Sequence, residues 1–404
     1  MNILVLANEY PYDKFPRKNW TKTVNYFARA WVKQGHQVVV IVNATRFPSV
    51  YYRVASFLKS IIASKYDIDS SDVDNSSWTK PFGFEDEGVL VFNMPMLKRR
   101  PGGKFSKSEF RRQEHKIVAQ LKKIGFTPDA ITGHWLNPQL ELIVRLKSHY
   151  QAKTAFVFHI DYQEENCRKF NAIGNAPRLD HIGCRCLADA KKIMGWLPLK
   201  EHPFLCPSGV PDEYVEEAIS NNSPKTFGKV PLKILTCGRM VQYKQFPAVI
   251  EAASKSFGRY ELNIIGDGPL RCELESFAAS IGQAGNVHFL GRIPRDKVQK
   301  MMSESEIFAL VSIQETFGMV YLEAMLQGCI VVASKDGGVD GIIIDGENGF
   351  LCEEGNAEEL TQVLKKIQSL STEEKISISQ NAIKTAKEYS DSKVAARYLE
   401  NVIK

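Results

Sequence analysis

The stretch that decides the fold is Ser312-Ile-Gln-Glu315-Thr-Phe-Gly318-Met-Val-Tyr-Leu-Glu323-Ala-Met-Leu-Gln-Gly328-Cys-Ile-Val-Val-Ala-Ser334. The short apolar run just before it, at residues 307–311, predicts a buried strand. The residues after Thr316 have the apolar spacing of a helix and end at a glycine, which is a common helix stop. A second apolar run at residues 330–333 predicts another buried strand. The stretch therefore predicts a strand–helix–strand unit of a parallel sheet.

Two glutamates in this stretch suggest a ligand. Glu315 lies just before the expected helix start, and Glu323 follows about two turns later. The free backbone N–H groups and the dipole of a helix start favour a bound phosphate. A carboxylate further along can accept hydrogen bonds from the vicinal hydroxyls of a ribose. The pattern therefore predicts a site for a sugar nucleotide.

Strands alternate with helical patterns along the whole chain, in two series. This alternation predicts an α/β protein with two Rossmann-like domains, each built on a parallel sheet. A chain of 404 residues is long enough for two full cores. The polar stretch at residues 206–228 separates the two series, so we predict domains at residues 1–206 and 207–388, with the last helix at about 389–404. The predicted strands are at residues 3–7, 38–42, 89–92, 130–132, 155–158 and 181–184 in the first series and at 234–236, 262–265, 287–290, 307–311 and 330–333 in the second.

Several motifs of the second half resemble those of glycosyltransferase family 4. Besides the stretch from Ser312, these are Ile-Leu-Thr-Cys-Gly-Arg-Met-Val-Gln-Tyr-Lys at 234–244, Asn-Ile-Ile-Gly-Asp-Gly-Pro at 263–269 and Phe-Leu-Gly-Arg-Ile-Pro at 289–294. Ser-Gly-Val-Pro at 208–211 stands where the family has its linker. The resemblance is dense from about residue 207 to 355 and thinner before it. It implies a retaining glycosyltransferase of the GT-B fold, with two parallel sheets facing a central cleft and a C-terminal helix that crosses back to the first domain.

The resemblance also implies roles for individual residues. Glu315 and His159 are expected at the reacting sugar as the catalytic pair. In the first domain, which would bind the acceptor, His134 and Asp161 are expected to contact that acceptor. The second domain would hold most of the donor, with Glu323 on the ribose and Arg239 and Lys244 on the diphosphate. The expected donor-binding residues are Asn19, Arg239, Lys244, Ile293, Glu315, Phe317, Gly318, Met319, Val320 and Glu323.

Two departures from the family pattern keep other functions open. Lys18-Asn19 stands where the family usually has two glycines, and Gly337-Gly-Val-Asp-Gly341 lacks the usual Pro-Glu. One alternative is an isomerase like the nucleotide-sugar 2-epimerases, which share the architecture. Another is an inactive subunit that binds a nucleotide sugar and supports a partner glycosyltransferase.

We expect no metal and no cofactor beyond the nucleotide-sugar substrate. The cleft motifs contain no Asp-x-Asp, and Arg239 with Lys244 can supply the positive charge. A site that recognises guanine would need a carboxylate soon after the loop at 291–294, where this chain has Pro294 and Arg295. This favours a uridine nucleotide, so we expect a UDP-sugar donor.

Charge is distributed unevenly. Residues 1–200 carry 31 Lys and Arg against 18 Asp and Glu, and the remainder carries 21 against 28. A basic half of this kind favours a polyanionic partner. Because no zinc-finger or RNA-recognition signature is present, we expect an anionic membrane surface and not nucleic acid. Residues 51–66 are a candidate basic amphipathic helix, although a helix packed on its own domain would have the same pattern.

The sequence also suggests a place of action. It has neither a signal peptide nor an apolar stretch of roughly 20 residues, and its eight cysteines are scattered. We therefore expect a cytoplasmic protein with reduced cysteines, docked peripherally on the inner face of the cell membrane. The expected acceptor is a glycan, a glycolipid or a lipid-linked sugar of the cell envelope.

Overall fold

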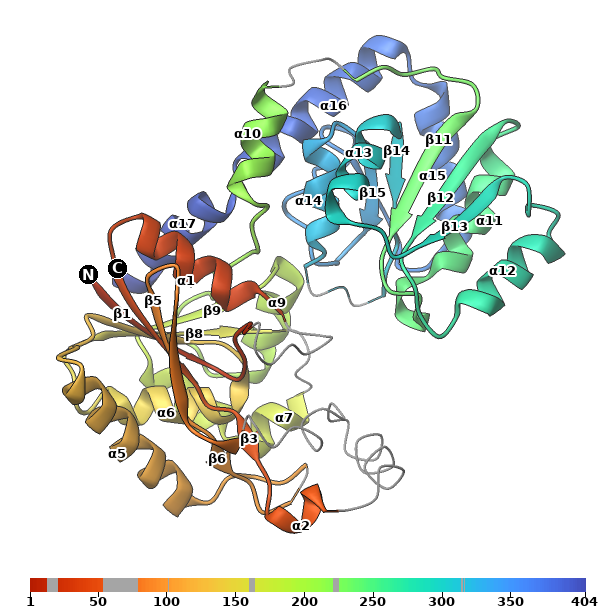
Figure 1. The fold of residues 1–404 in the computed structure, drawn as a ribbon. Helices are drawn as coiled ribbons and strands as arrows, with labels where there is room; N and C mark the ends of the chain where they lie inside the picture. Colours follow the sequence, from red (N-terminus) through yellow and green to blue (C-terminus); the bar gives the residue numbers. More distant parts are fainter. Residues whose placement is uncertain are drawn as a thin grey trace. The chain divides into compact units, whose positions relative to one another are not determined.

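The computed structural model describes residues 1–12, 21–53, 79–100, 102–159, 164–220, 225–313, 315 and 317–404. Asn19, Asp161 and most of the candidate amphipathic helix at 51–66 lie outside this range. The chain divides into two compact units (Figure 1), and each has its own sheet and hydrophobic core. The first unit holds Met1–Cys184, Asp189–Cys206 and Ala395–Lys404, and the second holds Arg185–Ala188 and Pro207–Val394.

The first unit is built on an eight-stranded sheet in the order β10-β9-β8-β7-β1-β2-β5-β4. All of its neighbouring strands run parallel except β4 and β5, which are antiparallel. A small two-stranded sheet pairs β3 with β6. The strands are β1 (Asn2–Ala7), β2 (Gln37–Val42), β3 (Thr45–Arg46), β4 (Phe82–Asp86), β5 (Val89–Asn93), β6 (Met96–Leu97), β7 (Ala130–Gly133), β8 (Lys153–Phe158), β9 (His181–Cys184) and β10 (Phe204–Leu205).

Both faces of the central strands are covered. In β1, Leu4 and Leu6 belong to the core formed with α5 and α6, and the alternating Ile3 and Val5 are also fully buried. Two buried faces explain why this strand reads as a continuous apolar run. Figure 1 shows α1 and α17 on one face of this sheet and α5 and α6 on the other. The helices of this unit are α1 (Thr23–Lys33), α2 (Ser49–Tyr52), α5 (Lys107–Lys123), α6 (Leu136–Leu146), α7 (Glu164–Lys169), α8 (Ala172–Asn175), the 3-10 helix η2 (Ala176–Arg178) and most of α9 (Leu187–Trp196).

The end of the last helix, α17 (Asp391–Ile403), packs into the first unit. The indole N–H of Trp31 donates to the Ala395 carbonyl at 2.8 Å. The Tyr398 ring lies 5.2 Å from that of Trp31 and 5.1 Å from that of Phe27. The chain therefore returns to its first unit at the C-terminal end, through buried aromatic packing.

The second unit has a six-stranded, fully parallel sheet in the order β13-β12-β11-β14-β15-β16. This confirms the predicted α/β class with parallel sheets. Its strands are β11 (Leu232–Cys237), β12 (Tyr260–Ile265), β13 (Val287–Gly291), β14 (Ile307–Ala309), β15 (Ile330–Ser334) and β16 (Phe350–Cys352). Its helices are α10 (Asp212–Ser220), η3 (Gln242–Lys244), α11 (Phe246–Ser256), α12 (Arg271–Ser280), α13 (Arg295–Glu304), α14 (Met319–Leu326), α15 (Ala357–Ser369) and α16 (Thr372–Lys387), with the start of α17.

The helix predicted from the opening stretch is α14, and it ends as the sequence predicts. Gly328 has a φ of +74°, and its N–H donates to the Met325 carbonyl at 2.9 Å. The next N–H, from Cys329, donates to Ala324 at 3.0 Å, which completes a Schellman motif. The stop at Gly328 brings the chain directly back into β15, beside β14.

All eight cysteines are free thiols. Across the described ranges, none of the helices is both long enough and apolar enough to span a bilayer.

Candidate functional site

Two glycine-containing loops of the second unit pack against each other where β11 and β12 end. A methyl group added at Gly266 would lie 1.9 Å from the Gly238 carbonyl oxygen, and one at Gly268 would lie 2.4 Å from that of Met240. The Met240 N–H donates to the Asp267 carbonyl at 3.0 Å. These contacts fix the backbone on either side of Arg239, whose side chain is exposed. A cation at the carboxyl end of a parallel strand is well placed to meet an anionic ligand.

Lys244 and Glu315 form an ion pair beside these loops. The Lys244 ammonium, at the end of η3, contacts Oε2 of Glu315, and each side chain is only 12% exposed. The two residues follow β11 and β14, which are neighbours in the sheet. The Ile313 N–H donates to the Tyr243 carbonyl at 2.7 Å and ties the two loops together. The predicted diphosphate-binding lysine and the predicted sugar-binding glutamate are therefore in direct contact.

The start of α14 is open. Gly318 precedes the helix with a φ of +74°, no side chain that the structure describes caps the first turn, and that turn contains no acidic residue. Phe317 is buried, and a methyl group at Gly338 would lie 2.3 Å from the Phe317 Cα, so the loop at 337–338 supports this turn from behind. The N–H groups of Met319 and Val320 belong to the first helical turn, which has no intrahelical acceptors for them. The turn thus has the properties of an anion site.

Glu323 is buried and held by two side chains of α13. Arg295 donates to its Oε1, and the Gln299 amide donates to its Oε2 at 3.0 Å. Burial raises the pKa of the Glu323 carboxyl, and the hydrogen bonds from Arg295 and Gln299 oppose that rise. Each carboxylate oxygen accepts one of these bonds, and a carboxylate has about four acceptor positions. Glu323 therefore retains acceptor capacity for a pair of hydroxyls.

Ile293 follows β13 in a loop joined to the glycine loops. Its side chain is half-buried against the hydrophobic core of the second unit. The Gly266 N–H donates to the Gly291 carbonyl at 2.8 Å, and Gly291 has a φ of +70°. Because the Ile293 side chain faces the core, a ligand at this loop would contact the backbone of Ile293.

In the first unit, His159 and His134 are linked. Nδ1 of His134 lies 3.0 Å from Nε2 of His159, and Nε2 of His134 lies 3.3 Å from the Tyr398 hydroxyl. The Trp135 ring stacks on His159 with 5.1 Å between centroids. His134 is 0% exposed and His159 is 8% exposed. The His134 side chain does not reach the surface, so it is not placed to contact an acceptor directly, as the sequence analysis expected, and contacts His159 instead.

Three residues of the second unit surround the site without having been expected there. Arg295 and Gln299 hold Glu323 from successive turns of α13. Arg185 is 3% exposed, and its guanidinium lies 5.6 Å from the centre of the Phe317 ring. The spacing of Arg295 and Gln299 places them on one face of a helix, which the sequence could have indicated. No local motif marks Arg185.

Among the described residues, the structure contains no group of three His, Cys, Asp or Glu side chains that could hold a metal ion.

The sequence of the second unit matches a known family. A family model described as "Glycosyl transferases group 1" matches residues 220–387. The lipopolysaccharide core biosynthesis glycosyltransferase LpsE of Rhizobium meliloti is 33% identical over 134 residues, which is 33% of this chain and 38% of LpsE. The match with LpsE thus spans well under half of that protein. An uncharacterized glycosyltransferase of Methanocaldococcus jannaschii is 29% identical over 339 residues, which is 81% of this chain and 89% of that protein.

Solved structures show the same architecture. The crystal structure of Anabaena HepE in complex with UDP superposes with a TM-score of 0.67 at 16% identity, covering 99% of this chain and 99% of HepE. At this identity the likeness concerns the fold. Residues 220–387 thus match the group 1 glycosyl transferases, and the chain has the GT-B fold of two Rossmann-like α/β domains.

Proposed function

We propose that the protein is a retaining glycosyltransferase that moves a sugar from a nucleotide diphosphate to an acceptor hydroxyl. The observation that carries this proposal is a pair of cation-paired glutamates around one open helix start, with Glu323 buried and Glu315 half-buried. Glu315, just before α14, forms an ion pair with Lys244. Glu323, in the second turn of α14, forms an ion pair with Arg295. A site that only stabilised the fold would gain little from two such pairs, because taking the glutamate charges largely out of water is costly.

The donor parts map onto this arrangement in order. The diphosphate meets Arg239, Lys244 and the first N–H groups of α14, whose dipole favours negative charge. The ribose hydroxyls donate to Glu323. The base lies against the backbone beside Ile293, and the lack of a carboxylate directly after that loop favours uracil.

Donor binding changes the partner of Lys244. Without a donor, the Lys244 ammonium neutralises Glu315. When a diphosphate binds, the ammonium turns toward the phosphate oxygens, and the freed Glu315 carboxylate faces the sugar. Glu315 then stabilises the positive charge that develops on the sugar ring as the glycosidic bond breaks.

In the transfer, the bond between the anomeric carbon and the phosphate oxygen breaks, and the electron pair leaves with the diphosphate. The acceptor oxygen bonds to the same face of the anomeric carbon, and its proton passes to the leaving phosphate. We also propose a catalytic role for His159, as the family resemblance implies. Arg239 and Lys244 neutralise the leaving group, so we propose a reaction without a metal.

We further propose a UDP-sugar donor and an envelope acceptor, used at the inner face of the cell membrane. The name of LpsE, a lipopolysaccharide core biosynthesis glycosyltransferase, supports an envelope glycan or a lipid-linked acceptor. The excess of basic residues in the first 200 positions supports an anionic surface as the place of action.

The test is turnover with a panel of UDP-, GDP- and ADP-sugars, with and without lipid-linked and saccharide acceptors. Mass spectrometry would follow the released nucleotide and the glycosylated acceptor, and NMR the anomeric configuration. We expect acceptor-dependent transfer with retention, unaffected by EDTA. A donor sugar changed at carbon 2 without an acceptor would indicate an isomerase. Binding without any turnover would indicate the inactive subunit.

A further inference from the structure

The first unit contains a cavity that the proposed transfer does not use. It measures about 720 Å³ and lies among α5, α6 and the segment of α7, α8 and η2. Its apolar lining comes from Phe105, Phe110, Leu136, Val144 and Phe170. Neither His134 nor His159 lines it. A volume of this size is typical of pockets for small organic ligands.

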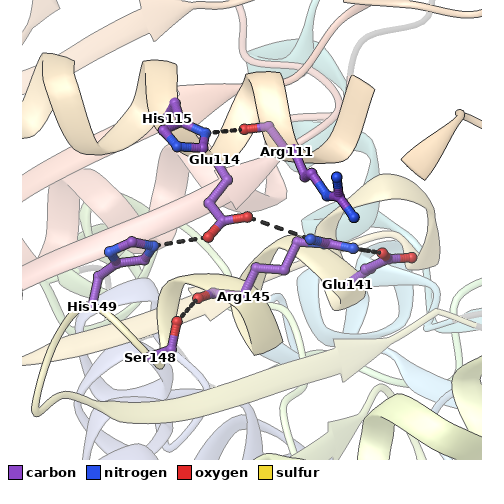
Figure 2. A network of polar contacts seen from close by, with 7 residues as sticks. All are labelled: Arg111, Glu114, His115, Glu141, Arg145, Ser148 and His149. Carbon is purple, nitrogen blue, oxygen red and sulfur yellow. Dashed lines mark hydrogen bonds and ion pairs between the residues drawn. The ribbon is translucent and has the colours of Figure 1, made fainter. Parts of the chain in front are cut away.

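The two carboxylates in the cavity wall are already paired. Arg145 donates to Oε1 of Glu141 at 2.7 and 3.0 Å and to Oε2 of Glu114 at 3.4 Å. His149 lies 2.8 Å from the other oxygen of Glu114, as Figure 2 shows. The Arg145 guanidinium also lies 5.6 Å from the Phe110 ring. The acidic groups of the wall therefore bond to the protein and leave the cavity without an unpaired carboxylate.

The remaining charged side chains of the cavity are all basic. They are Lys104, Lys107, Lys169 and Arg178. Within the part of the chain that the structure describes, none of these four forms an ion pair. Four cations above a neutralised wall give the cavity a positive potential, which concentrates anions.

A buried amide in the cavity lacks a partner. Asn175, at the end of α8, lines the cavity and is only 4% exposed. Its Nδ2 is buried and makes no hydrogen bond to any residue that the structure describes. Leaving a buried donor unsatisfied is costly, and a ligand oxygen that the amide turned to meet would remove that cost. The amide and the four cations would all bind acceptor oxygens of a ligand.

We propose that this cavity binds a phosphorylated carbohydrate. The four cations suit the double negative charge of a phosphomonoester better than a single carboxylate. The cavity has room for a sugar ring beside the phosphate, with its C–H face on the phenylalanines and its hydroxyls on the amides of Asn137, Asn171 and Asn175. The ligand is either a free sugar phosphate or the phosphorylated polyol head of a lipid.

The test is calorimetric titration of the full chain at constant ionic strength with glucose 1-phosphate, glucose and inorganic phosphate. A fourth arm measures binding to phosphatidylcholine vesicles with and without phosphatidylinositol phosphate. We expect saturable binding of glucose 1-phosphate or of the phosphoinositide vesicles, and none of glucose. Asn175→Asp replaces the unpaired donor with an anion and should weaken this binding about tenfold or more.

Two double variants at surface lysines test the cavity even if Asn175→Asp does not fold. Lys104→Gln/Lys107→Gln removes two cations at the cavity and should weaken binding severalfold. Lys116→Gln/Lys123→Gln removes two cations from α5 residues that do not line the cavity and should leave binding intact. The proposal would be overturned if the protein bound neither glucose 1-phosphate nor the phosphoinositide vesicles. It would also be overturned if the two lysine double variants lost equal binding affinity. Nucleotide binding by the second unit tests the proposed transfer separately, so the two can fail independently.

Discussion

Glu315 and Glu323 differ in what surrounds them, and this separates their roles. Among the described side chains, only that of Lys244 bonds to Glu315. Glu323 is held from two sides by Arg295 and Gln299. A carboxylate with a single cation partner can change partners during a reaction, and one held by two donors is preorganised to bind. These surroundings fit the proposed roles, with Glu315 in the chemical step and Glu323 in ribose recognition.

Glu315→Gln should lower turnover far more than it lowers nucleotide affinity. Glutamine keeps the shape of the side chain and removes the charge that stabilises the reacting sugar, so we expect kcat to fall roughly 100-fold or more. The Kd for the nucleotide alone should change little, because the base, ribose and diphosphate contacts remain. Steady-state kinetics with calorimetry measures both quantities. Equal losses in kcat and affinity would give Glu315 a structural role.

Gly318→Ala should destabilise the second unit and abolish the open helix start. Its φ of +74° is unfavourable for alanine, and the new methyl group would lie 2.4 Å from the Tyr321 ring. The conformation alone should cost about 1–2 kcal/mol of unfolding free energy. Urea denaturation of three variants separates the causes.

Gly346→Ala has the same strain, at a φ of +79°, with no atom within 4 Å of the new methyl group. Gly258→Ala has neither strain nor a close contact. We expect losses in the order Gly318, Gly346, Gly258. A Gly318→Ala variant that loses no more stability than Gly346→Ala would show that Tyr321 does not constrain this turn.

At the level of single residues, the sequence predicted the groups that belong to local motifs. The ion pair of Lys244 with Glu315 brings together two such groups from different motifs. Arg295, Gln299 and Arg185 were missed because their importance comes from elements that meet only in the folded unit. The predicted helix stop at Gly328 depends on local backbone geometry alone and was confirmed.

At the level of elements, the antiparallel hairpin of β4 and β5 was only half predicted. The apolar run at 89–92 indicated β5, but β4 alternates and contains glycine and two acidic residues. The strands are joined by Glu87 and Gly88, with φ values of 48° and 84°. Two positive φ values suit the two-residue turns of hairpins, so Glu-Gly was an available signal. β3, β6, β10 and β16 were missed because two or three residues give no periodicity.

Asp86 joins this hairpin to α1. It accepts hydrogen bonds from Tyr10 at 2.6 Å, from Asn25 at 2.8 Å and from the Arg29 guanidinium at 2.5 and 2.9 Å. Burial raises the pKa of Asp86, but these bonds together outweigh it and hold the pKa below its usual value of 3.8. The network therefore ties the edge of the sheet to the helix that covers it.

Asp86→Asn should reduce the acid sensitivity of the first unit. Because the folded-state pKa is lowered, Asp86 contributes stability that is fully present above pH 3.8 and is lost as the pH falls through the folded value. Asparagine cannot titrate, so this part of the acid dependence disappears, at a cost of about 1–3 kcal/mol at neutral pH. Urea unfolding from pH 7 down to pH 2.5 measures it. Identical pH slopes for the variant and the parent protein would contradict the role of Asp86.

At the level of the whole molecule, the alternation of strands and helices was enough to predict two parallel α/β units. Their long central strands read clearly because both faces are buried. The polar stretch after residue 206 was read as a linker, yet it contains α10, whose first turn has Asp212 and Glu213. The membership of Arg185–Ala188 in the second unit could not be predicted, because it depends on long-range packing.

The basic first half predicts reversible capture by anionic membranes. Each basic residue near such a surface gains roughly 1 kcal/mol, and screening shortens the Debye length from about 10 Å at 0.1 M salt to about 3 Å at 1 M. Co-sedimentation should show capture by anionic vesicles at low salt, little at high salt and none by neutral vesicles. Arg99→Gln/Arg100→Gln should reduce capture more than Lys297→Gln/Lys300→Gln, which removes the same charge from the acidic half. Equal capture by neutral vesicles would leave a soluble acceptor as the better proposal.

The central claim is that the second unit binds a nucleotide through Glu323, and the most direct measurement is calorimetric titration of UDP, GDP and ADP. Glu306 provides a matched control, because it is also buried and accepts bonds from the Gly228 and Lys229 N–H groups at 3.0 and 2.9 Å, just before β14. We predict that UDP binds best and that Glu323→Ala costs about 1.5–3 kcal/mol of binding, roughly 10- to 150-fold in Kd. Glu306→Ala should lower stability and leave the Kd unchanged. Unchanged affinity of Glu323→Ala for all three nucleotides would contradict the account.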